Sequence, residues 1–318
     1  MMRNGREMMV IKGNNIPEGS FSKVSISIGV FDGLHNGHRR VLQKLLEVSK
    51  NLNTSSMVVT MHPDPIKILN PEVSFTVLTP LSRKILYLEE MGVDYCFILE
   101  LDKNLLSLSP LEFFQRFIVD RFSPQAIVVG EDFRFGRNRE GDVQLLQDFS
   151  QKFGFQFYGL PLLSIGNKKV SSSVIREYLA QGKIQEAKTY LGRVPEICGK
   201  IVSGEGRGRT LGYPTANLLP EFEFYLKPGV YVGRVIIGRD TRPALLYAGT
   251  SPTFGGEVLR YEIYIPEFSG NLYGRNVIFF IEEIIRDEKK FKSREEIIRQ
   301  LSADRENLMR YLRFAIRV

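Results

Sequence analysis

The first half of the chain alternates short apolar runs with longer amphipathic segments. Between Val24 and Val30, apolar residues alternate with small ones, which is the period of a β-strand. From Arg39 to Lys50, apolar residues recur at helical spacing and charged residues occupy the opposite face. Further strands are expected at residues 56–60, 95–99, 126–129 and 155–160, with helices at residues 81–91, 110–121 and 143–153. This alternation predicts an α/β fold with a parallel sheet, which binds ligands beyond the carboxyl ends of its strands.

The pattern changes after Gly192, where strands follow one another without intervening helices. An antiparallel barrel or sandwich is typical of such a run with Gly and Pro in its connections. Two closing helices are expected, one starting near Ser293 and one near Ala303, each with a serine or aspartate as a cap. The expected strands cover residues 196–203, 230–237, 244–249, 260–265 and 277–285. We therefore predict two domains, residues 1–188 and residues 189–318.

Composition limits the classes of protein to consider. No apolar run approaches the roughly 18 residues of a membrane span, and Met1–Asn15 does not resemble an export signal, so we expect a cytoplasmic protein without membrane contact. Cys96 and Cys198 stand alone, which indicates buried packing residues rather than a disulfide or a zinc site. The net charge of +7 suits nucleic acid or small anionic substrates. Because the excess of basic over acidic residues is spread over both halves and not concentrated in one, we expect no nucleic-acid partner.

Two of the three histidines, His35 and His38, fall where the first strand turns into the first helix. A tight turn and a helix N-terminus aim several backbone N–H groups at one point, which favours a phosphate. The imidazoles add donors, and Gly37 between them lets a nucleotide approach the backbone closely. The pair could instead simply cap and pack the turn. A metal pair would need further ligands, and we interpret the third histidine, His62, as structural.

Three motifs give these histidines a context. GVFDGLHNGH at 29–38, VVGEDFRFG at 128–136 and VSSSVIR at 170–176 resemble, in order and spacing, the adenylyltransferase half of the bifunctional riboflavin kinase/FAD synthetase family, a group of HxGH nucleotidylyltransferases. The resemblance implies that His35 and His38 hold the ATP phosphates and that Asp132 lies near the nucleotide or flavin phosphate. Ser172, Ser173 and Arg176 would then grip the departing pyrophosphate, as suits hydroxyl and guanidinium donors. Gly29, Phe31, Asp32 and Gly37 complete the expected nucleotide-binding residues.

The second half carries its own resemblance. GEGRGRTLGYPTAN at 204–217, followed by GTSPTF at 249–254, RYEIYIPEF at 260–268 and NLYG at 271–274, resembles the riboflavin kinase signature. It implies that Gly204, Gly206 and Gly208 cover the phosphates and that Thr215 and Asn217 hold Mg2+ and nucleotide. Glu262 would be the catalytic general base. Hydroxyl and amide oxygens do suit a hard cation. Taken alone, a glycine-rich loop is equally a hairpin turn, and Glu262 an outward-facing strand residue.

The two resemblances together imply a two-domain enzyme. The C-terminal antiparallel barrel would phosphorylate riboflavin to FMN with Mg2+ and ATP. The N-terminal Rossmann-like domain would transfer AMP from ATP to FMN, giving FAD and pyrophosphate. Flavins are then substrates and products, and we expect a monomer or weak oligomer. The alternatives are an HxGH adenylyltransferase for another acceptor, which leaves PTAN unexplained, and a basic RNA-binding protein with an OB-like barrel, which lacks an aromatic and basic stripe.

Overall fold

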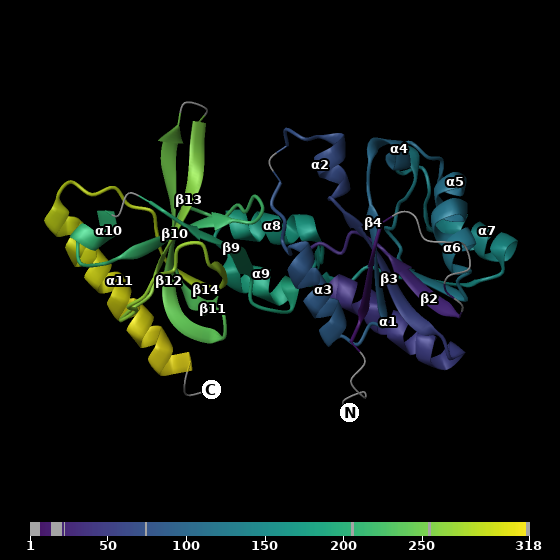
Figure 1. The fold of residues 1–318 in the computed structure, drawn as a ribbon, viewed down its shortest axis with the longest axis horizontal. Helices are drawn as coiled ribbons and strands as arrows, with labels where there is room; N and C mark the ends of the chain where they lie inside the picture. Colours follow the sequence, from purple (N-terminus) through teal and green to yellow (C-terminus); the bar gives the residue numbers. More distant parts are fainter. Residues whose placement is uncertain are drawn as a thin grey trace. The chain divides into compact units, whose positions relative to one another are not determined.

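The computed structural model describes residues 7–13, 21, 23–73, 75–204, 207–253 and 256–315. It divides the chain into two compact units, coloured along the sequence in Figure 1. The first unit comprises Met1–Ser74 and Leu81–Ser171, and the second comprises Phe75–Pro80 and Ser172–Val318. The compact units therefore differ in their limits from the expected functional domains, 1–188 and 189–318, which remain a prediction about activity.

The first unit is built on a six-stranded parallel sheet in the order β1-β4-β3-β2-β5-β6. All residues of β2 are buried, because helices cover both faces of the sheet. The five predicted strands are confirmed; the additional strand β1 is short and lies at the sheet edge. The strands are β1 (Met9–Lys12), β2 (Val24–Ile28), β3 (Ser55–His62), β4 (Tyr95–Glu100), β5 (Ala126–Gly130) and β6 (Gln156–Leu160).

Two apolar cores hold helices against this sheet. On one face α1 (Asn36–Leu52) and α3 (Leu81–Glu90) bury leucines such as Leu42 and Leu88. The opposite face is rich in phenylalanine, contributed mainly by the helices near residues 110–122 and 143–153 (Figure 1). The helix expected at 110–121 is divided by a π-helical turn into α5 (Pro110–Phe114), η1 (Gln115–Val119) and α6 (Asp120–Phe122). The remaining elements are α2 (Pro65–Leu69), α4 (Lys103–Leu106), η2 (Arg137–Arg139), α7 (Val143–Phe153), β7 (Ser164–Ile165) and β8 (Lys168–Lys169).

The second unit contains a closed antiparallel barrel in the order β10-β13-β12-β11-β14-β9, which confirms the predicted barrel. Its strands are β9 (Glu196–Val202), β10 (Thr215–Pro220), β11 (Gly229–Ile237), β12 (Asp240–Thr253), β13 (Gly256–Tyr264) and β14 (Asn276–Asp287). Strand β10 was not among the predicted strands, and it carries Thr215 and Asn217. The short helix α10 (Arg207–Thr210) precedes it.

The expectation of two closing helices is wrong, because a single helix, α11 (Arg294–Ala315), runs through Ala303. Ser293 accepts a hydrogen bond from the Glu296 N–H (3.2 Å), as a cap should. Asp304 does not start a second helix. Its buried carboxylate accepts two 2.8 Å hydrogen bonds from the Arg286 guanidinium on β14, so this polar position anchors α11 to the barrel.

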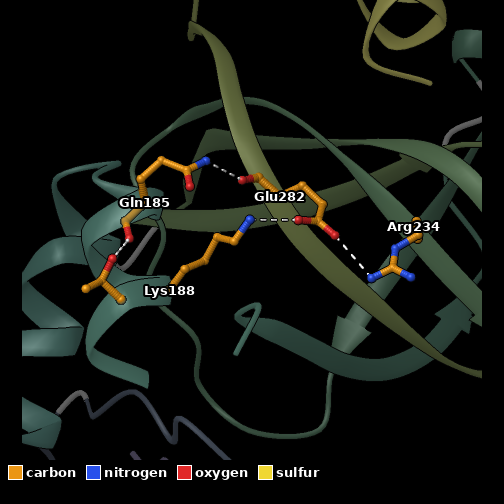
Figure 2. Close-up of polar contacts among 5 residues, drawn as sticks. Gln185, Lys188, Arg234 and Glu282 are labelled. Carbon is orange, nitrogen blue, oxygen red and sulfur yellow. Dashed lines mark hydrogen bonds and ion pairs between the residues drawn. The ribbon is translucent and has the colours of Figure 1, made fainter. Parts of the chain in front are cut away.

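Helices α8 (Ser172–Ala180) and α9 (Ile184–Leu191) precede the barrel in sequence but belong to its unit. Figure 2 shows the polar contacts that attach α9 to the barrel. The Glu282 carboxylate on β14 accepts from Lys188 (3.0 Å) and from Arg234 on β11 (3.1 Å), while its backbone carbonyl accepts from Gln185 (3.1 Å). The Glu282 side chain is only 8% exposed, and the two cations offset the cost of burying its charge.

The segment Phe75–Pro80 also belongs to the second unit. The Phe75 N–H donates to the Glu223 carboxylate (2.7 Å), and the Val77 N–H donates to the Glu223 carbonyl (3.1 Å). The Thr76 hydroxyl accepts from the Tyr225 N–H (2.9 Å). The chain therefore passes from one unit to the other three times, at 74/75, 80/81 and 171/172.

Cys96 and Cys198 are both buried and free, as predicted. None of the helices in the described part of the chain has the length and apolar character needed to cross a membrane.

Candidate active sites

The histidine turn joins the end of β2 to the start of α1. Phe31, Gly33 and Leu34 have positive φ values of 51°, 86° and 41°, so the chain bends sharply before the helix begins. His35 is the N-cap residue, and its Nδ1 accepts a hydrogen bond from the His38 N–H at 3.3 Å. The two imidazole rings stack, with centroids 3.7 Å apart and planes 14° apart. Capping is thus one role of His35, and it also aligns both imidazoles at the helix N-terminus.

Glycines make room for these rings. A Cβ added at Gly37 would lie 3.1 Å from the His35 ring and 3.6 Å from the Val170 carbonyl oxygen. A Cβ at Gly29 would lie 3.1 Å from the Phe31 ring, which itself packs edge-on against His38 at 5.3 Å between centroids. Asp32, 6% exposed, lies within the same turn. The structure therefore brings together the predicted residues of GVFDGLHNGH in one tightly packed turn.

Asp132 follows β5 and forms an ion pair with Lys169 on β8, with Nζ and Oδ2 2.7 Å apart. Both side chains are substantially exposed, so the pair adds little stability and mainly orients its two groups. Val170, the next residue after Lys169, lies near the histidine turn, since its carbonyl oxygen would be 3.6 Å from a Cβ added at Gly37. Lys169 was not among the predicted site residues, although it directly precedes the VSSS motif.

Ser172, Ser173 and Arg176 lie on α8, and so in the second unit. The Arg176 Nε donates to the Thr76 carbonyl (2.7 Å), and its guanidinium lies over the Phe75 ring, 4.0 Å from the ring centroid. This segment supplies an acceptor and an aromatic face that fix the arginine side chain. The expected role of these three residues in holding pyrophosphate stays a prediction.

The predicted kinase residues meet on the barrel. Asn217 on β10 and Glu262 on β13 are directly paired in the antiparallel register, and Thr215 lies two positions from Asn217 on the same face. The Thr215 hydroxyl donates to Glu262 Oε2 at 2.6 Å. Glu262 is therefore only partly exposed and is held by a defined partner, unlike a fully solvated carboxylate.

The glycine loop lies directly against these residues. A Cβ added at Gly204 would lie 1.8 Å from Asn217 Nδ2, and one at Gly208 would lie 3.0 Å from Thr215 Oγ1. Only glycine allows such an approach of backbone to side chain. Gly206, the third predicted glycine, lies outside the described residues.

The oxygen atoms at this position fit a magnesium ion. Thr215 offers a hydroxyl and Asn217 an amide oxygen, both hard oxygen ligands. Magnesium usually takes one or two protein oxygens and completes its shell with water and substrate phosphates. Within the described ranges, no group of three or more His, Cys, Asp and Glu residues could hold a metal.

His62 is the last residue of β3. Burial lowers the pKa of its imidazole, and the positive charges of Lys84 and Lys12 lower it further. Its interpretation as a structural residue stays a prediction.

Comparison with known proteins covers both halves of the chain. A family model described as FAD synthetase matches residues 18–174, and one described as riboflavin kinase matches residues 191–312. The bifunctional riboflavin kinase/FMN adenylyltransferase of Escherichia coli (strain K12) is 33% identical over 299 residues, which cover 93% of this chain and 96% of the relative. The protein of that name from Buchnera aphidicola subsp. Schizaphis graminum is 31% identical over 308 residues, 96% of this chain and 99% of the relative.

A crystal structure from Streptococcus pneumoniae, titled as a macrolide-efflux protein, has the same fold. It matches with a TM-score of 0.83 and 30% identity, and the match covers 94% of this chain and 98% of that one.

The contact between the glycine loop and Asn217 predicts a specific loss of activity. Gly204→Ala should displace the Asn217 side chain and lower phosphorylation of riboflavin by about 10²-fold, a usual result of misplacing a binding group by an ångström. Initial rates with riboflavin, ATP and Mg2+ measure this.

A double-mutant cycle supplies the control. If Gly204→Ala acts through Asn217, adding it to Asn217→Ala should cost little more than Asn217→Ala alone. Fully additive losses would show that Gly204 acts elsewhere.

Proposed function

The chain belongs to the bifunctional riboflavin kinase/FMN adenylyltransferase family, and from that premise we propose which residues carry each of its two reactions. The enzyme phosphorylates riboflavin to FMN and adenylylates FMN to FAD, with ATP as co-substrate in both steps. We assign adenylylation to residues 1–188 and phosphorylation to residues 189–318. We further propose a cytoplasmic monomer or weak oligomer with flavins and ATP as its only partners, consistent with positive charge spread over both halves.

The Thr215–Glu262 hydrogen bond beside the glycine loop carries the kinase assignment. The riboflavin 5′-hydroxyl is a weak nucleophile at neutral pH. The Glu262 carboxylate orients this hydroxyl and accepts its proton while the hydroxyl oxygen bonds to the γ-phosphorus and the bond to the departing ADP breaks. Because Thr215 donates to Oε2, the carboxylate is held in one orientation, and we assign the proton transfer to Oε1.

The glycine loop and β10 hold the ATP phosphates. Gly204 and Gly208 bring backbone N–H groups close to the phosphates, which are cradled without steric obstruction from side chains. Thr215 and Asn217 would hold a magnesium ion, whose charge, when bound, offsets that of the phosphates. The Thr215 hydroxyl can both orient Glu262 and hold the ion. Its proton is donated to the Glu262 carboxylate, and its oxygen lone pairs can bind the magnesium ion.

The histidine turn carries the adenylylation assignment. An FMN phosphate oxygen attacks the α-phosphorus of ATP, and the bond from that phosphorus to the bridging oxygen of pyrophosphate breaks. His35 and His38 donate to the phosphate oxygens at the N-terminus of α1, where the helix dipole also favours negative charge. These donors stabilise charge that builds up during transfer.

Other residues bind the nucleotide and the products. Gly29, Phe31, Asp32 and Gly37 shape the turn that receives the nucleotide. Asp132, paired with Lys169, lies near the nucleotide or flavin phosphate. On α8, Arg176 offers a fork of donors, and Ser172 and Ser173 offer hydroxyls, for the departing pyrophosphate.

His38→Ala should remove one phosphate donor from adenylylation alone. We expect FAD formation from FMN to fall by about 10²- to 10³-fold, the usual result of removing a donor to transition-state charge. Riboflavin phosphorylation should keep its rate, because that reaction belongs to the barrel. Chromatography of the flavins measures both rates in one preparation, and equal losses in a folded protein would favour a purely structural histidine.

Glu262→Gln tests the general base. Glutamine keeps the shape and cannot take the proton, so kinase turnover should fall by roughly 10²- to 10⁴-fold, with much smaller changes in KM. Adenylylation of supplied FMN should continue.

Glu283→Gln is the matched control, because Glu283 is an exposed glutamate on β14, a strand of the same barrel that does not pair with β13, and should leave both rates unchanged. A folded Glu262→Gln variant with the original kinase rate would remove Glu262 from the mechanism.

A further inference from the structure

Among the lysines that the structure describes, Lys84 is the one that is buried, with 5% of its surface exposed. It projects from α3, whose Leu88 belongs to the core against the sheet. Its Nζ donates to the Val30 carbonyl at 2.6 Å and to Thr60 Oγ1 at 3.3 Å. The Thr60 hydroxyl donates to the same Val30 carbonyl at 3.1 Å. Two donors from different elements thus converge on one backbone oxygen.

Burying this ammonium opposes folding, because a charged amine loses its hydration. Burial lowers the pKa of Lys84, and the carboxylates of Asp32 and Asp64 act in the opposite direction. The neighbouring core residues are apolar, and a methionine would fill the same volume without this desolvation. Packing alone therefore does not account for a lysine at this position.

The carbonyl that Lys84 holds lies at the start of the histidine turn. Val30 follows the end of β2 and precedes Phe31, whose φ of 51° is unusual for a bulky side chain. Fixing the Val30 carbonyl fixes the plane of the Val30–Phe31 peptide. Phe31 in turn packs edge-on against the His38 ring. A continuous set of contacts therefore leads from the Lys84 ammonium to His38.

We propose that Lys84 is a positioning residue for adenylylation: by holding the Val30 carbonyl, it maintains the strained turn that presents His35 and His38 to the ATP phosphates. This inference rests on the proposed role of the histidine turn. Lys84 affects the alignment of the histidines in the transition state, because it acts through the backbone of the turn and not by contact with substrate. Loss of Lys84 should therefore lower kcat and leave KM nearly unchanged.

Three variants of the full-length enzyme test this proposal. Lys84→Met removes the donor and keeps most of the volume, and should lower kcat for FAD formation from FMN by about 10²-fold. Thr60→Val removes the second donor to the same carbonyl with nearly the same shape, and should lower kcat by about tenfold, a smaller misplacement than loss of the lysine. Lys44→Met removes a lysine charge from the surface of α1, where it pairs with Glu47, and should change nothing.

Each variant is assayed at a temperature well below its thermal unfolding transition, with riboflavin phosphorylation as the internal reference. Loss of adenylylation kcat, with both KM values within about threefold of wild type and the kinase rate intact, supports the proposal. Wild-type kcat in a folded Lys84→Met variant overturns it, even where stability falls. If that variant does not fold, wild-type kcat in Thr60→Val overturns it. A wild-type enzyme that forms no FAD from FMN and ATP would instead refute the proposed function.

Discussion

Close approach of backbone to functional side chains is the constraint on which both proposed sites depend. In the first unit, Gly37 leaves the space that the stacked His35 and His38 rings occupy. In the second, Gly204 lies so near Asn217 that any Cβ would displace the amide. A polyphosphate is best held by N–H groups that are already in place, since fixed donors need little reorganisation during transfer. Each unit meets this need with glycines beside the end of a strand.

The rest of each unit keeps these turns in place. Parallel pairing of β2 with β3 and β5 fixes the end of the strand that leads to His35, and Lys84 holds the Val30 carbonyl, two residues beyond that end. In the barrel, the register of β10 with β13 sets Asn217 opposite Glu262. Binding residues on such rigid elements are oriented before substrate arrives, which is why the regular fold matters to transfer chemistry.

The hydrophobic pattern of the sequence was sufficient to predict those helices and strands whose burial it reflects. The alternating period of Val24–Val30 and the helical period of Arg39–Lys50 predicted the elements on either side of the histidine turn. The features that the pattern did not predict depend on tertiary contacts. A second helix was expected to start near Ala303, yet one long helix runs through this position and the Asp304 carboxylate is bound by Arg286. Neither the docking of Phe75–Pro80 on residues 223–225 nor the burial of Lys84 leaves a periodic signal, because both depend on partners distant in sequence.

The central claim is that one chain performs two successive displacements at phosphorus in two separate sites. The most direct measurement is a time course of purified protein with riboflavin, ATP and Mg2+, in which flavins are separated by chromatography and pyrophosphate is assayed in parallel. The account predicts that FMN appears first, that FAD follows, and that pyrophosphate is released in a one-to-one ratio with FAD. Unchanged riboflavin, or FAD formed without an equal amount of pyrophosphate, would contradict it.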